Sequence, residues 1–232
     1  MSTYGWVDLC SVLFPFLFSF HPKLRFYRKW GALFPAVLGM MGLFIPWDAL
    51  FTRAGVWGFN AEHICDVHVI GLPIEEWFFF LCIPYACVFT YHCFLVLGVK
   101  DRIGPHARTI SVALIIGLLC TSLWNWQRAY TSTTFILLAG LLSFITFIMK
   151  PSWMGRFYFA YAVLLIPFLI VNGILTGTGL THAVVWYDDS ENLGLRILTI
   201  PIEDVFYGML IVLMTLTIYE AILARDTPTE DR

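Results

Sequence analysis

Charged residues are scarce in this chain. Asp, Glu, Lys and Arg together make up 13% of its 232 residues, about half of the roughly 25% typical of soluble domains. Hydrophobic residues account for 59% and aromatic residues for 17%. This composition excludes an ordinary soluble domain and predicts that lipid surrounds most of the chain. The net charge of -2 gives no sign of a basic surface, and we expect no nucleic-acid partner.

The features of a secreted protein are also missing. No basic residue precedes the first apolar run, as a cleaved signal peptide would require. Four basic residues follow that run instead: Lys23, Arg25, Arg28 and Lys29. The six cysteines form no CxxC pair and no disulfide framework. We therefore interpret the first run as a membrane span with its N-terminus outside.

Seven apolar runs are close to the roughly 20 residues that a helix needs to cross a bilayer. They lie at 4–20, 31–50, 72–97, 109–126, 133–149, 157–175 and 197–222. With the N-terminus outside, only three of the 14 Lys and Arg residues fall on the outer side: Arg53, Arg128 and Arg196. The excess on the inner side predicts an all-α, polytopic membrane protein of about seven transmembrane helices, with its C-terminus inside.

The sequence repeats at an offset near 128 residues. Leu72-Pro73-Ile74-Glu75-Glu76-Trp77-Phe78 corresponds to Ile200-Pro201-Ile202-Glu203-Asp204-Val205-Phe206, and Trp57 corresponds to Trp186. Each copy holds three spans, and an unmatched fourth span makes the two copies parallel. We predict a first repeat at 1–100, a linking span at 101–130, a second repeat at 131–224 and a polar inner tail at 225–232.

Two acidic pairs stand at equivalent positions of the repeats: Glu75-Glu76 and Glu203-Asp204. Pro73 and Pro201 mark helix starts, so the carboxylates fall in the first turn of spans that run from outside to inside. Acids there can simply complement the helix dipole. Ionisable residues inside spans are costly, however, and are usually functional. Because the pair is repeated, we predict that both pairs face a common site.

Such a site suits acid–base chemistry. Burial and a nearby like charge both favour the protonated form of a carboxyl group, so one group can act as an acid and another as a base. Aromatic residues around the motifs can stabilise a cation through their ring faces. These residues are Trp57, Phe59, Trp77, Phe78, Phe206 and Tyr207. Each of them could equally be an ordinary packing or lipid-facing residue.

These motifs resemble those of the membrane-integral lycopene cyclases of bacteria and archaea. The matching stretches are 47–52, 55–60, 72–77, 186–188, 191–194 and 200–204, and they extend over nearly the whole chain. Both halves are present, so the chain looks like the fused, self-sufficient form of that family. The resemblance implies conversion of lycopene through γ-carotene to β-carotene, an isomerisation without a metal or any other cofactor.

The resemblance and the residues together lead to a set of expected roles. We expect Glu76 and Glu203 to form the central catalytic pair, with Glu75 and Asp204 in support. The predicted substrate-binding residues are Asp48, Trp57, Asn60, Trp77, Asn172, Asn192 and Phe206. Asp48 and Asn172 occupy equivalent positions and could orient an acid or form a structural bond between helices. Arg196 could pair with Asp204.

The expected surroundings follow from the same resemblance. The partners are lycopene and other carotenoids within the lipid bilayer of a prokaryotic cytoplasmic membrane. A homo-oligomer, or association with other enzymes of the carotenoid pathway, stays open. The residues themselves do not say whether the ring is of the β or ε type, because that depends on which proton is lost.

Rival functions meet specific obstacles. A retinal protein needs a lysine inside its last span, yet Lys23, Lys29, Lys100 and Lys150 all lie near loops. A prenyltransferase needs repeated aspartate-rich motifs, and a nucleotide-binding enzyme needs a glycine fingerprint after a strand. The cluster from His63 to His68 has metal-ligand residue types but no counterpart in the second repeat. A proton-coupled transporter is the best rival, because parallel repeats and intramembrane acids suit it.

Overall fold

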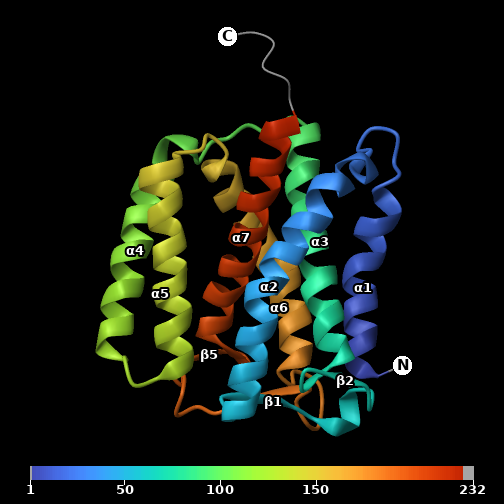
Figure 1. Ribbon diagram of the computed structural model, residues 1–232, viewed down its shortest axis with the longest axis vertical. Coiled ribbons are helices and arrows are strands. Elements are labelled where there is room, and N and C mark those ends of the chain that lie inside the picture. The colour runs from blue at the N-terminus through green and yellow to red at the C-terminus, as the bar shows by residue number, and fades with distance from the viewer. Residues whose placement is uncertain (1, 227–232) are drawn as a thin grey trace.

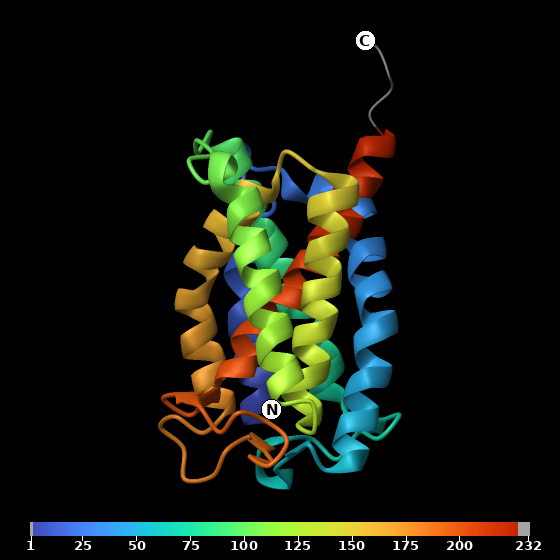
Figure 2. The same cartoon turned by 90° about the vertical axis from the view of Figure 1, so that its left-hand side faces the viewer.

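The computed structural model describes residues 2–226, which form a bundle of seven α-helices (Figures 1 and 2). The helices are α1 (Thr3–Phe18), α2 (Trp30–Ala54), α3 (Ile74–Val96), α4 (Ala107–Trp124), α5 (Ala129–Ser143), α6 (Met154–Leu175) and α7 (Ile202–Asp226). One helix falls on each apolar run, so the predicted helical architecture is confirmed. Six helical segments are long and apolar enough to cross a membrane, whereas α1 has only 16 residues.

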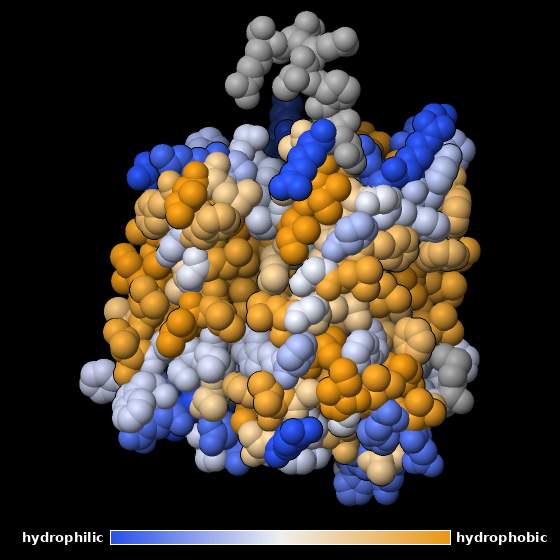
Figure 3. Space-filling view, viewed as in Figure 1, coloured by the Kyte–Doolittle hydropathy of each residue, from blue (hydrophilic) through white to orange (hydrophobic). Residues whose placement is uncertain are grey.

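The outer surface of the bundle matches a membrane protein. Figure 3 shows hydrophobic side chains over the flank of the bundle and hydrophilic ones gathered toward its two ends. Large apolar side chains such as Leu123 and Ile148 are more than two-thirds exposed, at 74% and 71%. Contiguous apolar exposure of this kind is costly in water and is satisfied by lipid.

Among the described residues, six short strands lie in the loops at the end of the bundle that holds the N-terminus, and the sequence analysis did not predict them. The strands are β1 (Trp57–Phe59), β2 (His68–Val69), β3 (Leu72–Pro73), β4 (Val185–Tyr187), β5 (Arg196–Ile197) and β6 (Ile200–Pro201). The predicted spans at 72–97 and 197–222 therefore begin too early, because their first residues belong to hairpins. Pro73 closes one hairpin and stands just before α3.

The two hairpins are copies of one another. β2 pairs with β3 through His68 and Pro73, and β5 pairs with β6 through Arg196 and Pro201, each residue 128 positions after its counterpart. Their turns also match, because Ile70 and Leu198 have φ values of 57° and 58°. A bulky residue rarely adopts this left-handed conformation. The shared backbone therefore supports an internal repeat at this offset.

β1 and β4 join the two halves of the chain. They pair antiparallel, with Gly58 opposite Trp186. Three short connections, 19–29, 97–106 and 150–153, lie at the opposite end of the bundle, and α5 reaches it through η4 (Phe144–Met149), a π-helical turn. The domain boundaries at 1–100, 101–130 and 131–224 stay a prediction. The predicted tail at 225–232 lies mostly outside the described residues.

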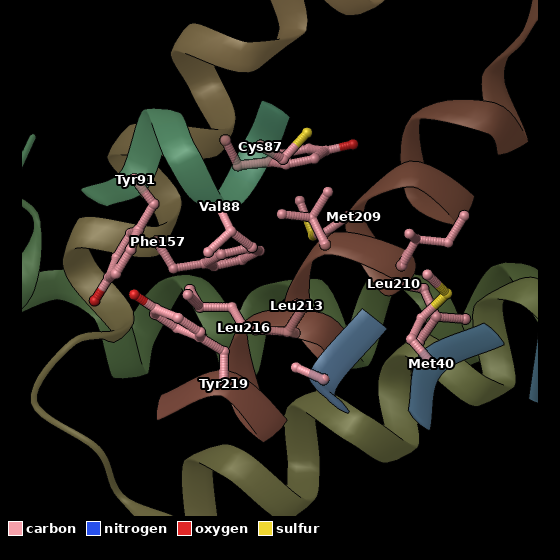
Figure 4. Packing of buried hydrophobic residues seen from close by; sticks show 14 of the residues in the cluster. Met40, Cys87, Val88, Tyr91, Phe157, Met209, Leu210, Leu213, Leu216 and Tyr219 are labelled. Carbon is pink, nitrogen blue, oxygen red and sulfur yellow. The ribbon is translucent and has the colours of Figure 1, made fainter. Parts of the chain in front are cut away.

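The core lies between α2, α3, α6 and α7. Figure 4 shows Met40, Val88, Phe157 and Leu213, one residue from each of these helices, packed in one cluster of buried side chains. The helix α2 packs along α7, and α3 packs against α6. Helices from the first and second halves of the chain therefore alternate, and neither half has a separate core. The helices α1, α4 and α5 flank this group (Figure 1), and α5 packs on α7 and adds Leu138 to the same buried cluster.

One close approach ties α6 to the connection before α4. An added Cβ at buried Gly155 would lie 2.3 Å from the backbone nitrogen of Gly104. We predict that Gly155→Ala lowers the apparent melting temperature in detergent, because overpacking costs roughly 1–3 kcal/mol. Gly42→Ala is the matched control, since an added Cβ there meets nothing within 4 Å. Equal melting temperatures for both variants would contradict this packing.

Candidate functional site

The four acidic residues lie at the outer ends of α3 and α7, where each helix leaves its hairpin. Glu75, Glu76, Glu203 and Asp204 are all buried, with at most 7% of each residue exposed. Each pair occupies the first turn of its helix, where the helix dipole favours negative charge. Burying four carboxyl groups is costly without hydrogen bonds. Their partners therefore show what each acid does.

The first acid of each pair holds the loop that precedes its helix. Oε1 of Glu75 accepts hydrogen bonds from the backbone nitrogen of Cys65, at 2.8 Å, and from the hydroxyl of Ser2. Oε1 of Glu203 accepts equivalent bonds from the backbone nitrogen of Leu193, at 2.7 Å, and from the hydroxyl of Thr131, at 2.6 Å. Both acids therefore fasten a loop at the hairpin end of the bundle to the start of a helix.

The second acid of each pair accepts a hydrogen bond from a tyrosine on another helix. The hydroxyl of Tyr4, the second residue of α1, donates to Oε2 of Glu76. The hydroxyl of Tyr130, the second residue of α5, donates to Oδ1 of Asp204 at 2.5 Å. The two halves of the chain thus use the same arrangement at Glu76 and Asp204.

The remaining partners of these two acids differ. Oδ2 of Asp204 accepts from the side-chain nitrogen of Asn172 at 2.7 Å and from the hydroxyl of Tyr187 at 3.0 Å. Burial and the nearby Asp204 raise the pKa of Tyr187 well above its usual value, so its hydroxyl stays protonated. Together with Tyr130, these residues give Asp204 three hydrogen-bond donors. Three donors match a carboxylate, which only accepts hydrogen bonds.

Glu76 meets a second carboxyl group in place of an amide. The side chains of Asp48 and Glu76 lie within hydrogen-bonding reach of one another. Oδ1 of Asp48 accepts from the indole nitrogen of Trp57 at 2.6 Å, and its buried Oδ2 has no donor among the described residues. Two carboxylates cannot bond without a proton between them. The Asp48–Glu76 pair is therefore suited to hold a proton.

Both centres open into one cavity of about 170 Å³. Asp48, Glu76 and Asp204 line it, whereas Glu75 and Glu203 do not. A comparably measured apolar cavity of roughly 150 Å³ holds benzene in another protein. The space therefore suits a six-membered ring, with carboxyl groups from both halves of the chain at its wall.

Aromatic rings surround the carboxyl groups of this cavity. The ring centroid of Trp57 lies 5.1 Å from that of Tyr130, 6.1 Å from that of Tyr207 and 6.3 Å from that of Tyr187. Tyr130 and Tyr187 are stacked at 5.8 Å. All four residues line the cavity. Ring faces so arranged can stabilise a cation between them.

The cavity includes some of the predicted site residues and leaves out others. Asp48, Trp57 and Asn172 line it, and Asp48 and Asn172 each contact the second acid of their own half. The expected central pair of Glu76 and Glu203 does not fit this arrangement, because Glu203 bonds to a loop outside the cavity. The sequence could not show which acid of a pair turns inward.

Four predicted substrate-binding residues lie away from the cavity lining. Asn60 accepts from the backbone of Glu62, and Asn192 accepts from that of Gly194, so both order the outer loops. The indole nitrogen of Trp77 donates to the carbonyl of Val69. The ring of Phe206 packs 5.0 Å from that of Phe135. The structure therefore places these four residues in loop and helix contacts, and their substrate-binding role stays a prediction.

The polar loop residues that the sequence analysis singled out have other partners in the structure. Arg196 forms an ion pair with Asp189 at 2.5 Å instead of pairing with Asp204, because β5 places it on the exposed hairpin. The imidazole of His63 contacts the hydroxyl of Thr3 and the carbonyl of His182. In residues 2–226, no group of three or more His, Cys, Asp or Glu side chains is arranged to hold a metal ion.

The sequence analysis did not identify several residues that lie at or near the carboxyl groups. Tyr4 and Tyr130 start apolar helices, where tyrosine is ordinary, and only their equal position in α1 and α5 could have signalled a role. Tyr187 stands beside Trp186 in a matched stretch and could have been noticed. Asp8 is a further buried carboxyl group on α1, and neither of its oxygens has a hydrogen-bond donor among residues 2–226.

Comparison with known proteins gives a consistent result. The family described as "Lycopene cyclase" matches residues 1–94 and 127–222, which leaves out α4. A "Bifunctional lycopene cyclase/phytoene synthase" of Neurospora crassa is 30% identical over 92 residues, which cover 37% of this chain and 15% of that protein. A protein of the same description from Aspergillus niger is 23% identical over 160 residues, which cover 65% of this chain and 25% of that protein. No solved structure matches the chain. The chain therefore spans a quarter or less of these curated relatives.

The loop-holding role of Glu203 can be tested by stability. Glu203→Gln keeps an oxygen that accepts from Leu193 and Thr131, so we predict a melting temperature in detergent close to that of the parent. Glu203→Ala leaves the buried donors unpaired, which costs roughly 1–3 kcal/mol, and should melt clearly lower. If the Gln variant were as unstable as the Ala variant, these hydrogen bonds would not be the main contribution of Glu203 to stability.

Proposed function

The chain belongs to the lycopene cyclase family, and we propose that it closes the end rings of lycopene, giving β-carotene by way of monocyclic γ-carotene. A carotenoid cyclase function follows from the family, and this particular route is the proposal. The observation that carries it is the shared cavity, in which a proton-holding carboxyl pair and a donor-rich carboxylate face an apolar, aromatic space.

In the proposed mechanism, the Asp48–Glu76 pair supplies the acid. Its proton adds to the terminal alkene of the linear end group and leaves a tertiary carbocation. The π electrons of a neighbouring alkene attack this cation, close a six-membered ring and move the positive charge into the ring. Tyr4 and Trp57 hold the pair in place by bonding to Glu76 and Asp48. General acid–base steps of this kind contribute about 10²–10⁴-fold to a rate.

Asp204 then acts as the base in this proposal. Its three donors stabilise the ionised form that must accept a proton from the ring carbon. One proton is added and one is lost for each ring, so the product is an isomer of the substrate. No oxidant, reductant or cofactor is needed, which agrees with an intramolecular lyase or isomerase. Before the next turnover, Asp204 releases this proton to the aqueous surroundings, and the acid pair takes up a proton from the same exchangeable pool.

The cavity supports the cation during these steps. The rings of Trp57, Tyr130, Tyr187 and Tyr207 lie beside the carboxyl groups and present π electrons to a positive charge. Water would trap the cation as an alcohol, and a lining of mainly apolar side chains within lipid excludes it. The same features disfavour a proton-coupled transporter, which would need a wetter route.

The proposed activity can be tested by expressing the chain alone in a lycopene-accumulating bacterium and separating the extracted pigments by chromatography. We expect β-carotene, with γ-carotene at early times. Unchanged lycopene, in cells whose membranes contain the intact protein, would contradict the proposal. A different carotenoid end group would then be the next substrate to supply.

Single substitutions test the assigned roles. Glu76→Gln and Asp204→Asn should each lower the yield of cyclised product by about 10²–10⁴-fold, because each removes an acid or base from the cavity. Glu75→Gln is the matched control, since Glu75 lies next to Glu76 but bonds outside the cavity and its oxygen acceptor is retained. The assignment fails if Glu75→Gln abolishes cyclisation while Glu76→Gln retains it.

The orientation is also part of the proposal. The excess of Lys and Arg on one side supports an outer N-terminus, an inner C-terminus and seven spans that include the short helix α1. We expect exposed Cys65 to react with a membrane-impermeant thiol reagent in intact cells. The double variant Cys65→Ser/Asp101→Cys, with its new thiol at the opposite end of the bundle, should react only after lysis, and the reverse result would invert the topology.

The cellular setting stays a prediction. Six apolar helices indicate a membrane protein, but the expected prokaryotic cytoplasmic membrane is untested, and the two curated relatives are fungal. Association into a homo-oligomer or with other pathway enzymes is likewise a prediction.

A further inference from the structure

The cavity continues away from the carboxyl groups toward one side of the bundle. Beyond Tyr4 and Asn172, its lining comes from the middle of α1, α3 and α6, with α7 behind them. Ser11, Ile83 and Phe168 belong to this part of the lining and are half-buried, and Pro167 is exposed. Residues that both line the cavity and reach the surface mark the place where it opens.

This opening lies near the middle of the membrane. Ser11 is eight residues below the outer end of α1, Ile83 is nine below that of α3, and Pro167 is eight below that of α6. At a rise of 1.5 Å per residue, these distances are about 12–14 Å. The hydrocarbon core of a bilayer is about 30 Å thick, so the three residues share a depth close to its centre.

The opposite side of the cavity is closed. On the closed side, α5 and α2 are the repeat counterparts of α1 and α6 on the open side. They contribute only Tyr130 and Asp48 to the lining. α2 packs closely along α7, and α4 packs along the outer side of α5. On the side of the opening, by contrast, α6 packs less closely against α3 than its counterpart α2 packs against α7. The pseudo-symmetry is therefore broken at the opening.

The rim of the opening is apolar and contains helix-weakening residues. The hydroxyl of Ser11 donates to the carbonyl of Val7 at 2.7 Å, so it has no proton left for a ligand. Each of the three bordering helices has an internal proline: Pro15, Pro84 and Pro167. Proline removes one hydrogen bond from a helix interior, which makes local widening less costly.

We propose that the opening between α1 and α6, bordered by Ser11 and Pro167–Phe168, is the lateral portal through which a carotenoid enters from the bilayer centre. The end group passes to the carboxyl groups, and the rest of the linear polyene lies in the slot and extends through the portal into lipid. An apolar chain dissolved between the leaflets meets the portal at its own depth. This inference rests on the proposed function and assigns the substrate's route.

A bulky side chain at the rim tests this route. We expect Ser11→Trp to lower the initial rate of cyclisation at least about ten-fold, equivalent to about 1.4 kcal/mol of added barrier. The matched control is Cys10→Trp. Cys10 directly precedes Ser11 in α1, is exposed and does not line the cavity. It should stay within about two-fold of the parent, as substitutions on an exposed surface usually do.

A second substitution separates a blocked portal from a damaged fold. Phe168→Ala, on the other side of the opening, should restore part of the rate of Ser11→Trp, which a misfolded variant would not recover. If Ser11→Trp does not accumulate in the membrane, Ser11→Leu against Cys10→Leu gives the same comparison with a smaller block. Equal rates for the residue 11 and residue 10 variants would overturn the portal, and so would a loss that Phe168→Ala leaves unchanged. An inactive parent chain would instead refute the proposed function.

Discussion

The structure depends on the need to satisfy carboxyl groups that are buried in an apolar bundle. An isolated buried carboxylate is too costly to keep, and here the four motif acids find donors on segments far away in the sequence. Glu75 and Glu203 hold outer loops through backbone nitrogens. Glu76 and Asp204 bring the starts of α1 and α5 against α3 and α7 through tyrosine hydroxyls. The same bonds that stabilise the outer end of the bundle therefore assemble the cavity.

The two halves of the chain surround the second acid of each pair in nearly the same way, but one neighbouring side chain differs between them. Where the first half places Asp48 beside Glu76, the second half places Asn172 beside Asp204. A carboxyl neighbour requires a shared proton, whereas an amide neighbour donates a hydrogen bond to a carboxylate and keeps its own hydrogen. An acid and a base on one cavity are what a cyclisation without a cofactor needs. The repeat thus provides two similar carboxyl positions, and the difference between Asp48 and Asn172 supports an acid at one and a base at the other.

Much of the fold could be predicted from the sequence, because lipid imposes a strong constraint on helix length and composition. All seven apolar runs became helices, and the acids stand in the first turns as expected. The second hairpin was missed because Ile197, Ile200 and Pro201 read as the start of an apolar run without an alternating pattern. The choice between Glu203 and Asp204 could not be made either. Adjacent residues of a helix point about 100° apart, and only the packing of α7 against α5 and α6 decides which one faces the cavity.

The most direct test of the account follows the proton. Cells that express the chain and accumulate unlabelled lycopene would be transferred to deuterated water during cyclisation, and the product would be analysed by mass spectrometry and NMR. A carboxyl acid that is reloaded from exchangeable protons predicts one deuterium for each closed ring, at the carbon that was protonated, and none in the remaining lycopene. A cyclised product without deuterium would contradict acid-initiated ring closure by Asp48 and Glu76.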